Sequence, residues 1–159
     1  MASAVATQHL RSGNLYQVWD HDPGTTDAKV TSADGGTTEK WVDMKEYSHF
    51  AAIAIQTVIG SSSGITKLEI VAADTADEGD SSLTVIKDSG TVDADALCDW
   101  LIEECSAEEV AQLASSTGYE LRYVAARITQ SHAGDEAVVV YHALPYHKYL
   151  NQTPATTIS

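Results

Sequence analysis

The sequence predicts a mainly β protein, an antiparallel β-sandwich or jelly-roll-like body with one helical insertion at about residues 93–117. Three observations support this prediction. Several short segments alternate apolar and polar residues with a period of two, which is the pattern of a strand that buries one face. Clusters of Gly, Ser and Asp separate these segments, as turns do. Only the region that starts at Asp93 changes to steps of three and four residues, the period of a helix.

Residues 47–59 give the strongest strand prediction. One face of this segment begins with Phe50 and continues with Ala at alternate positions, and the other carries Ile53 and Ile55. Because both faces are largely apolar, we expect a central strand that is covered on each side. Residues 65–72 follow as a second strand, and their alternation of charged and apolar side chains indicates that it is half-exposed.

Three further strands are predicted downstream. Residues 83–87 form a short strand, and residues 119–129 and 137–144 form two longer ones near the C-terminus. The turn that separates the last two, at residues 133–136, is short. Short turns usually join adjacent antiparallel strands, so we expect these two strands to pair with each other.

The helical insertion is predicted in two parts. Apolar residues that share one helix face recur through residues 94–105. Ser106 and Glu109 then form a capping box, which predicts a second short helix that starts at Ala107 and ends at Gly118. The apolar residues of the first part are Ala94, Leu97, Cys98, Leu101, Ile102 and Cys105.

The two cysteines, Cys98 and Cys105, lie seven residues apart. Two helical turns would separate them by about 10.5 Å. That distance exceeds the Cα separation of roughly 7 Å that a disulfide tolerates. We therefore expect core thiols, with a bridge to a neighbouring subunit as the alternative.

Composition divides the chain into three parts. Residues 1–40 are rich in Ala, Ser, Thr, Asp and Gly and are expected to form an extended N-terminal arm with one short strand near residues 16–19. Residues 41–150 form the β-rich body, and residues 151–159 form a Thr-rich C-terminal tail. The arm has too little apolar area to fold alone, so we expect it to become ordered against a neighbouring subunit.

The charge balance limits the classes of partner that the chain can bind. The chain has 23 acidic and 9 basic residues, a formal net charge of −14. Such a surface would be repelled by phosphates, so we expect no nucleic-acid partner. It suits a solvated exterior or a more basic partner surface. No segment reaches the ~18 consecutive apolar residues that a membrane-spanning helix needs, and the N-terminus lacks the pattern of a cleaved signal peptide.

No pattern in the chain assembles a catalytic or metal site. The six histidines are not accompanied by a Cys-x-x-Cys or His-Glu-x-x-His motif. The acidic segment that starts at Asp74 fails the helix-loop-helix calcium template, because Ala76 and Val85 occupy positions that need oxygen ligands. We therefore expect no enzymatic activity, no cofactor and no bound metal.

Four segments carry a resemblance to a known family. Trp41, Val42, Asp43 and Met44 lead into an Ala- and Ile-rich strand that ends in Gly, at residues 50–60. A strand that runs into an Ala-Thr-Asp type loop follows at residues 67–77, and a Tyr-x-Tyr-Val type strand lies at residues 120–124. Together they resemble the capsid decoration proteins (cement or head auxiliary proteins) of tailed bacteriophages, over roughly residues 40–145.

The resemblance implies a structural protein of the virion. Such a protein is made in the host cytoplasm, lies on the outer capsid surface as a trimer, binds the major capsid protein and has no catalytic residues. A neck or tail-tube protein is the first alternative, and a carbohydrate-binding adhesion module is a second, with only 7% aromatic residues to support it. The aromatic residues expected to anchor an interface are Trp19, Trp41, Tyr141, Tyr146 and Tyr149, with a core position as the alternative for Trp41.

Overall fold

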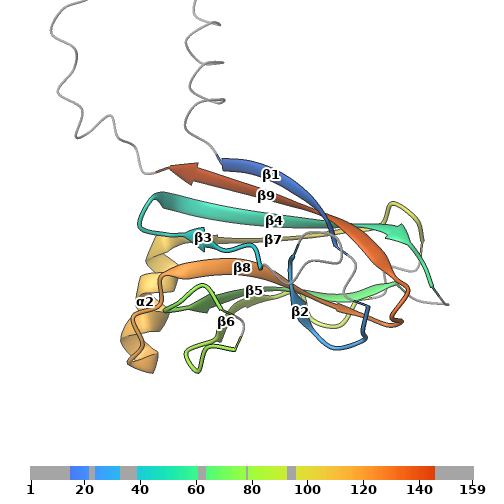
Figure 1. The fold of residues 1–159 in the computed structure, drawn as a ribbon. Coiled ribbons are helices and arrows are strands. Elements are labelled where there is room, and N and C mark those ends of the chain that lie inside the picture. The colour runs from blue at the N-terminus through green and yellow to red at the C-terminus, as the bar shows by residue number, and fades with distance from the viewer. Residues whose placement is uncertain are drawn as a thin grey trace, which may run out of the picture.

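The chain folds as a two-layer antiparallel β-sandwich with one helix (Figure 1), which confirms the predicted fold class. The strands predicted near 16–19, 47–59, 65–72, 83–87, 119–129 and 137–144 all have counterparts. The structure, a computed structural model, describes residues 15–21, 24–32, 39–60, 64–77, 79–92 and 96–145.

The two layers are called sheet A and sheet B. All pairings within them are antiparallel. Sheet A has the strand order β1 (Leu15–His21), β9 (Glu136–Pro145), β4 (Tyr47–Val58) and β7 (Trp100–Ser106). Sheet B has the order β2 (Lys29–Val30), β8 (Tyr123–Gln130), β5 (Ile65–Ala73) and β6 (Thr84–Asp88), and β3 (Val42–Asp43) also pairs with β8.

The core lies between the two sheets. Alternate residues of each strand point inward, as the period of two requires. At its centre the Tyr141 ring meets the Phe50 and Trp19 rings edge to face, with centroids 4.8 Å and 4.7 Å apart. The buried residues from the longest strands are Phe50, Ala52 and Ala54 of β4, Leu68, Ile70 and Ala72 of β5, Val124, Ala126 and Ile128 of β8, and Val139 and Tyr141 of β9.

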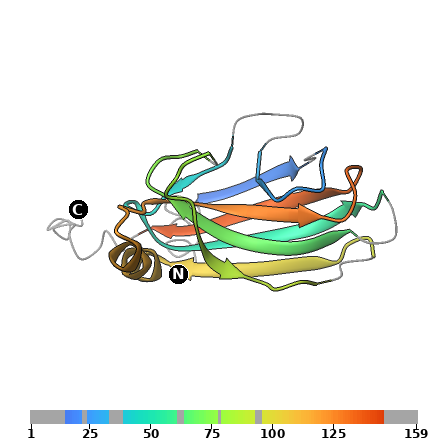
Figure 2. The same ribbon diagram turned by 90° about the horizontal axis from the view of Figure 1, so that it is seen from below.

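The single described helix, α2 (Ala107–Thr117), lies at one end of the sandwich and covers neither sheet (Figures 1 and 2). The predicted capping box is present: Ser106 accepts a hydrogen bond from the Glu109 amide, and the Glu109 carboxylate accepts one from the Ser106 amide. Glu109 also forms an ion pair with Lys87 of β6. Gly118 ends the helix in the left-handed conformation, with φ of 80°.

The first part of the predicted helical insertion is wrong. Residues 100–106 form β7, an edge strand of sheet A, in which Ile102 is the partner of Ile53. The segment also fits a period of two, and a short apolar segment cannot be assigned by periodicity alone. Pairing with β4 supplies the backbone hydrogen bonds that decide between the two. Residues 93–95 lie outside the described residues.

The predicted pairing of the last two strands is also wrong, because β8 and β9 belong to different sheets. The connection between them crosses from one layer to the other. Asp135 fixes this crossing: its carboxylate accepts hydrogen bonds from the Gly60 amide at 2.7 Å, the His132 amide at 2.8 Å and the Ser131 hydroxyl at 3.1 Å. A short connection fits an arch between layers as well as a hairpin, and here each strand buries its apolar face against the opposite sheet.

The predicted arm needs a correction as well. Strand β1 pairs with β9 over seven residues, from Leu15 opposite Ala143 to His21 opposite Ala137, and β2 pairs with β8. Residues 15–21 and 29–30 are therefore integral strands of the chain's own sandwich. Long-range backbone pairing, which composition does not reveal, places them there. Residues 1–14, 22–23 and 33–38 of the predicted arm, and the tail at 151–159, lie outside the described residues.

Candidate interaction surfaces

The outer face of sheet A carries two neighbouring apolar rows that run across the strands. The strand registers place the members of each row opposite one another on adjacent strands. We call these residues the apolar face. They are Val18, Val140, Ile53 and Ile102 in the first row, and Val138, Ile55 and Trp100 in the second.

The apolar face is exposed at its two edges and only partly exposed between them, where Val140 is buried at 9% exposure. Trp100 and Ile102 on β7 are 61% and 48% exposed, and Val18 on β1 is 53% exposed. None of these side chains belongs to the core cluster. Within the described part of the chain, no helix or strand lies over this face (Figure 1). Single exposed apolar side chains are ordinary, but a contiguous set of them marks an interaction surface.

The sequence signal for this face was the apolar character of both sides of residues 47–59. We expected such a strand to be covered on each side. The inner side, from Phe50 to Gln56, is covered by sheet B, but Ile53 and Ile55 on the outer side remain partly exposed. The expectation of a second covering layer is therefore wrong for the described residues, and the apolar pattern instead indicates a surface.

The strands of sheet A carry charged residues of one sign only. Its four strands contain no Lys and no Arg. The formally charged residues in them at pH 7 are Asp20, Glu103, Glu104 and Glu136. Glu104 is exposed and lies two residues beyond Ile102 on β7, so a negative charge borders the apolar face.

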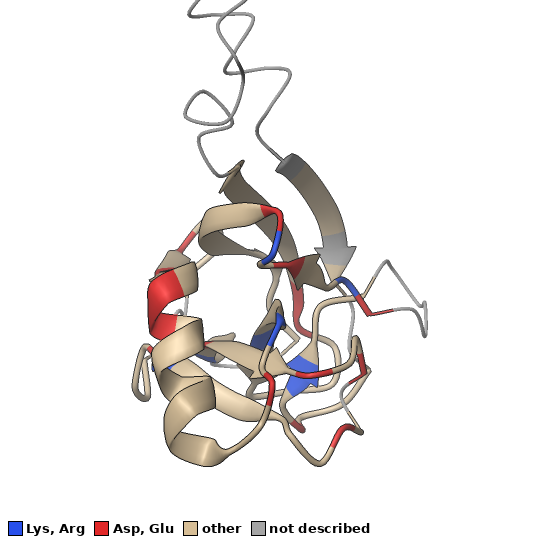
Figure 3. Ribbon diagram, turned by 90° about the vertical axis from the view of Figure 1, so that its left-hand side faces the viewer, with Lys and Arg blue, Asp and Glu red and all other residues tan. Residues whose placement is uncertain are grey.

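The outer face of sheet B has a different chemistry. Lys67 forms ion pairs with Glu69 and Asp88, both at 2.8 Å, and Arg127 forms one with Glu69 at 2.8 Å. Burial alone would raise the pKa of Glu69, but its hydrogen bonds to Arg127 and Lys67 outweigh burial and lower that pKa. Figure 3 shows basic residues among these strands and acidic residues on the first turn of α2. Lys67 and Arg127 are thus paired within this face.

The apolar residues at the middle of the outer face of sheet B are covered by the chain itself, although Val85 on the edge strand β6 is 39% exposed. Val71 of β5 and Ala125 of β8 are fully buried under a small second cluster that includes Val30 and the partly buried Trp41 and Leu83. Part of the half-exposed strand predicted at residues 65–72 is therefore buried on both sides. The two outer faces contrast: that of sheet B is covered at its middle and carries internal ion pairs, and that of sheet A is apolar and open at both edges.

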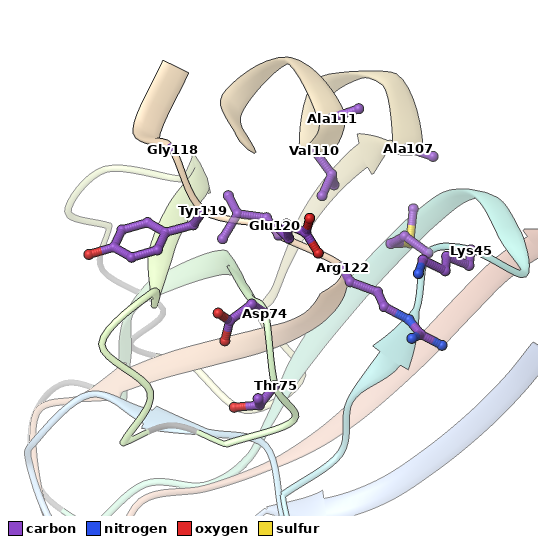
Figure 4. A pocket seen from close by; sticks show the side chains of 12 residues that line it. Lys45, Asp74, Thr75, Ala107, Val110, Ala111, Gly118, Tyr119, Glu120 and Arg122 are labelled. Atoms are coloured by element: carbon purple, nitrogen blue, oxygen red, sulfur yellow. The ribbon is translucent and has the colours of Figure 1, made fainter. Parts of the chain in front are cut away.

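A surface pocket of about 1020 Å³ lies between α2 and the turns at one end of the sandwich. Figure 4 shows Ala107, Val110 and Ala111 of α2 on one side of it and Asp74 and Thr75 on the other. Its remaining lining residues are Met44, Lys45, Gly118, Tyr119, Glu120, Leu121 and Arg122.

Three of the four segments that carry the family resemblance, residues 41–44, 67–77 and 120–124, meet beside this pocket. Arg122 donates two hydrogen bonds to the carboxylate of Asp43, one of them from Nε at 2.8 Å. The Met44 amide donates to the Arg122 carbonyl, and the Arg122 amide donates to the Ala73 carbonyl, both at 2.9 Å. The Arg122 side chain lowers the pKa of Asp43 chiefly through hydrogen bonding. Because these charges satisfy each other, Arg122 is committed to holding β3 against the start of β8.

The aromatic residues predicted as interface anchors lie elsewhere. Tyr141 is 0% exposed at the centre of the core, which contradicts a surface role. Trp19 is half-buried against Tyr141, and Trp41 packs on the small cluster over sheet B while its Nε1 donates to Glu39 at 2.7 Å. These residues are apolar and large, as anchors are, but the same properties draw them into the sandwich. Tyr146 and Tyr149 lie outside the described residues.

Sequence reasoning missed Trp100, Ile102 and Val18 as surface residues. The alternation of Trp100, Ile102 and Glu104 against Leu101, Glu103 and Cys105 could have indicated the first two.

Of the cysteines, Cys98 is exposed and Cys105 is buried, and both thiols are free. Burial raises the pKa of Cys105 to about 12.

Among the described residues, no three His, Cys, Asp or Glu side chains are grouped so that they could hold a metal ion. The same residues include no helix with the length and apolarity of a membrane span.

Comparison with protein-family models, with curated proteins and with solved structures gives no match. The surfaces of this chain and the segments of the resemblance are therefore the features that indicate a function.

Proposed function

We propose that this chain is a capsid decoration (cement) protein of a tailed bacteriophage. It is a structural protein of the virion that stabilises the head through protein–protein contacts. Its partner is the major capsid protein, and it lies on the outer capsid surface as a trimer. The observation that carries the proposal is the apolar face of sheet A, because an open apolar sheet face gains free energy only when another surface covers it.

The geometry of this face suits a protein interface. Four strands at about 4.8 Å spacing make it roughly 15–20 Å wide. Specific interfaces have an apolar centre of this kind, enriched in aromatic residues and surrounded by a polar rim. Trp100 supplies the exposed aromatic residue and Glu104 part of the rim.

The rigidity of the body supports the same function. A two-layer sandwich with its strand ends tied by groups such as Asp135 loses little conformational freedom on docking. The segments of the resemblance build this scaffold: they form β3, β4, β5 and the start of β8. The resemblance and the surface therefore point to the same role, that of a stiff unit that binds by one face.

The test is addition of the purified chain to heads of the encoding phage that were assembled without it. We expect cryo-electron microscopy to show copies over the whole shell, and heated heads to retain their DNA to a higher temperature than undecorated heads. Density at one vertex or along the tail would make the chain a neck or tail-tube protein. Failure to bind any part of the particle, with binding to immobilised glycans, would make it an adhesion module.

A further inference from the structure

We propose that the apolar face of sheet A is the surface that docks on the shell, and that the shell surface beneath it presents apolar side chains bordered by Lys or Arg. Sheet B then faces away from the shell. This inference rests on the proposed decoration function and adds the orientation of the protein and the chemistry of its partner.

The two outer faces differ in how much apolar area docking would remove from water. On sheet B, Lys67 and Arg127 are already paired with Glu69, and Val71 is already buried. Covering that face would desolvate the ion pairs, which costs free energy, and would bury little additional apolar area. On sheet A, Trp100 and Ile102 expose about half or more of their surface, so covering them removes apolar area from water.

The choice of partner follows from charge. The strands of sheet A contain four acidic residues and no Lys or Arg. A second copy docked face to face would bring like charges together around the apolar centre, which opposes association. A partner with cations at the border of its own apolar patch would pair with groups such as Glu104. Opposite charge would also speed the encounter at low salt.

The orientation is tested by a matched pair of variants. Ile102→Glu on β7 and Val85→Glu on β6 place the same charge on edge strands of opposite sheets, at side chains that are 48% and 39% exposed. Binding to undecorated heads is measured by co-sedimentation. We expect Ile102→Glu to weaken binding by about 10- to 100-fold, as loss of an interface anchor does, while Val85→Glu changes it less than about 2-fold.

Two further variants keep the test independent of one site. Val18→Glu, on the opposite edge of the apolar face and 53% exposed, should weaken binding as Ile102→Glu does. Glu104→Lys should slow association and reduce its dependence on salt if the partner's rim is basic. Far-ultraviolet circular dichroism and thermal unfolding establish that each variant is folded. These exposed positions should tolerate the substitutions.

Each outcome separates the inference from the proposed function. If the unaltered protein does not bind heads, both are overturned. If the unaltered protein binds, and Ile102→Glu and Val18→Glu both bind heads as tightly as the unaltered protein, only the docking face is overturned. If Glu104→Lys binds faster than the unaltered chain, the basic partner is overturned. If Ile102→Glu converts an oligomer to a monomer that still binds heads with unchanged affinity, the apolar face joins copies of this chain instead.

Discussion

Replacing Tyr141 with Phe should destabilise the sandwich although it removes a single oxygen. The Tyr141 hydroxyl belongs to sheet A but accepts a hydrogen bond from the Ala126 amide of sheet B at 2.7 Å. Thr31, just after β2, donates its own amide to the Ala126 carbonyl at 2.9 Å. Neither β2 nor β3 supplies an acceptor for the Ala126 amide of β8. The Tyr141 hydroxyl supplies that acceptor.

The expected magnitude follows from burial. Tyr141 is 0% exposed, so the Ala126 amide would lose its partner in a site closed to water. An unsatisfied buried amide costs about 1–3 kcal/mol. The Phe ring keeps the edge contacts with Phe50 and Trp19, so packing should change little. With a urea m-value of roughly 2 kcal/mol/M, the midpoint of unfolding should fall by about 0.5–1.5 M.

Equilibrium unfolding in urea, followed by tryptophan fluorescence and by circular dichroism, measures this change. Tyr119→Phe is the matched control, because its ring is 41% exposed and its loss of a hydroxyl should change the free energy of unfolding by less than about 0.5 kcal/mol. Equal midpoints for Tyr141→Phe, Tyr119→Phe and the unaltered protein would refute the argument that this hydroxyl links the two sheets.

Three other predictions follow from the structure. In the native protein a thiol reagent at pH 8 should label Cys98 and leave Cys105, whose pKa is raised to about 12, unlabelled until urea is added; fast labelling of both thiols would contradict the burial of Cys105. Deletion of residues 1–36 removes β1 and β2 and should lower the melting temperature or cause aggregation through the open edge of β9, so an unchanged melting temperature would contradict the integration of these strands. Because Arg122 lowers the pKa of Asp43 in the fold below its unfolded value of about 3.9, the ion pair stabilises above that pH, and its contribution is lost as pH falls through the folded pKa. Asp43→Asn should therefore melt below the unaltered protein at pH 6, with the gap closing under strong acid; a constant gap would contradict the linkage.

Much of the fold could be predicted from local pattern. Alternation marked β4, β5, β6, β8 and β9, and the Ser106 and Glu109 pair with Gly118 marked both ends of α2. These signals lie within about a dozen residues of sequence. The errors lie where the decision is made by distant residues. Residues 100–106 fit a helix or a strand until β4 is placed beside them, and the short link before β9 fits a hairpin or an arch until the layers are assigned.

The candidate site was harder to predict than the fold. The large aromatic residues were reasonable anchors, but Tyr141 is the centre of the core, and size alone does not separate a core position from a surface one. The apolar face depends on three inter-strand registers that bring Val18, Ile53 and Ile102 into one row. No window of the sequence contains all three. Only the two apolar sides of residues 47–59 gave a local indication of it.

The register of β1 with β9 has a practical consequence for engineering. Leu15 lies opposite Ala143, close to where β9 ends at Pro145, so the first and last described residues sit side by side at one pole of the sandwich. A cargo domain genetically fused directly to Leu15 or to Pro145, in place of the residues outside the described part of the chain, would start from that same pole. Joining Leu15 and Pro145 by a linker, with new termini opened in a surface turn, is the natural design for a circular permutant, since neighbouring ends make such rearrangement tolerable.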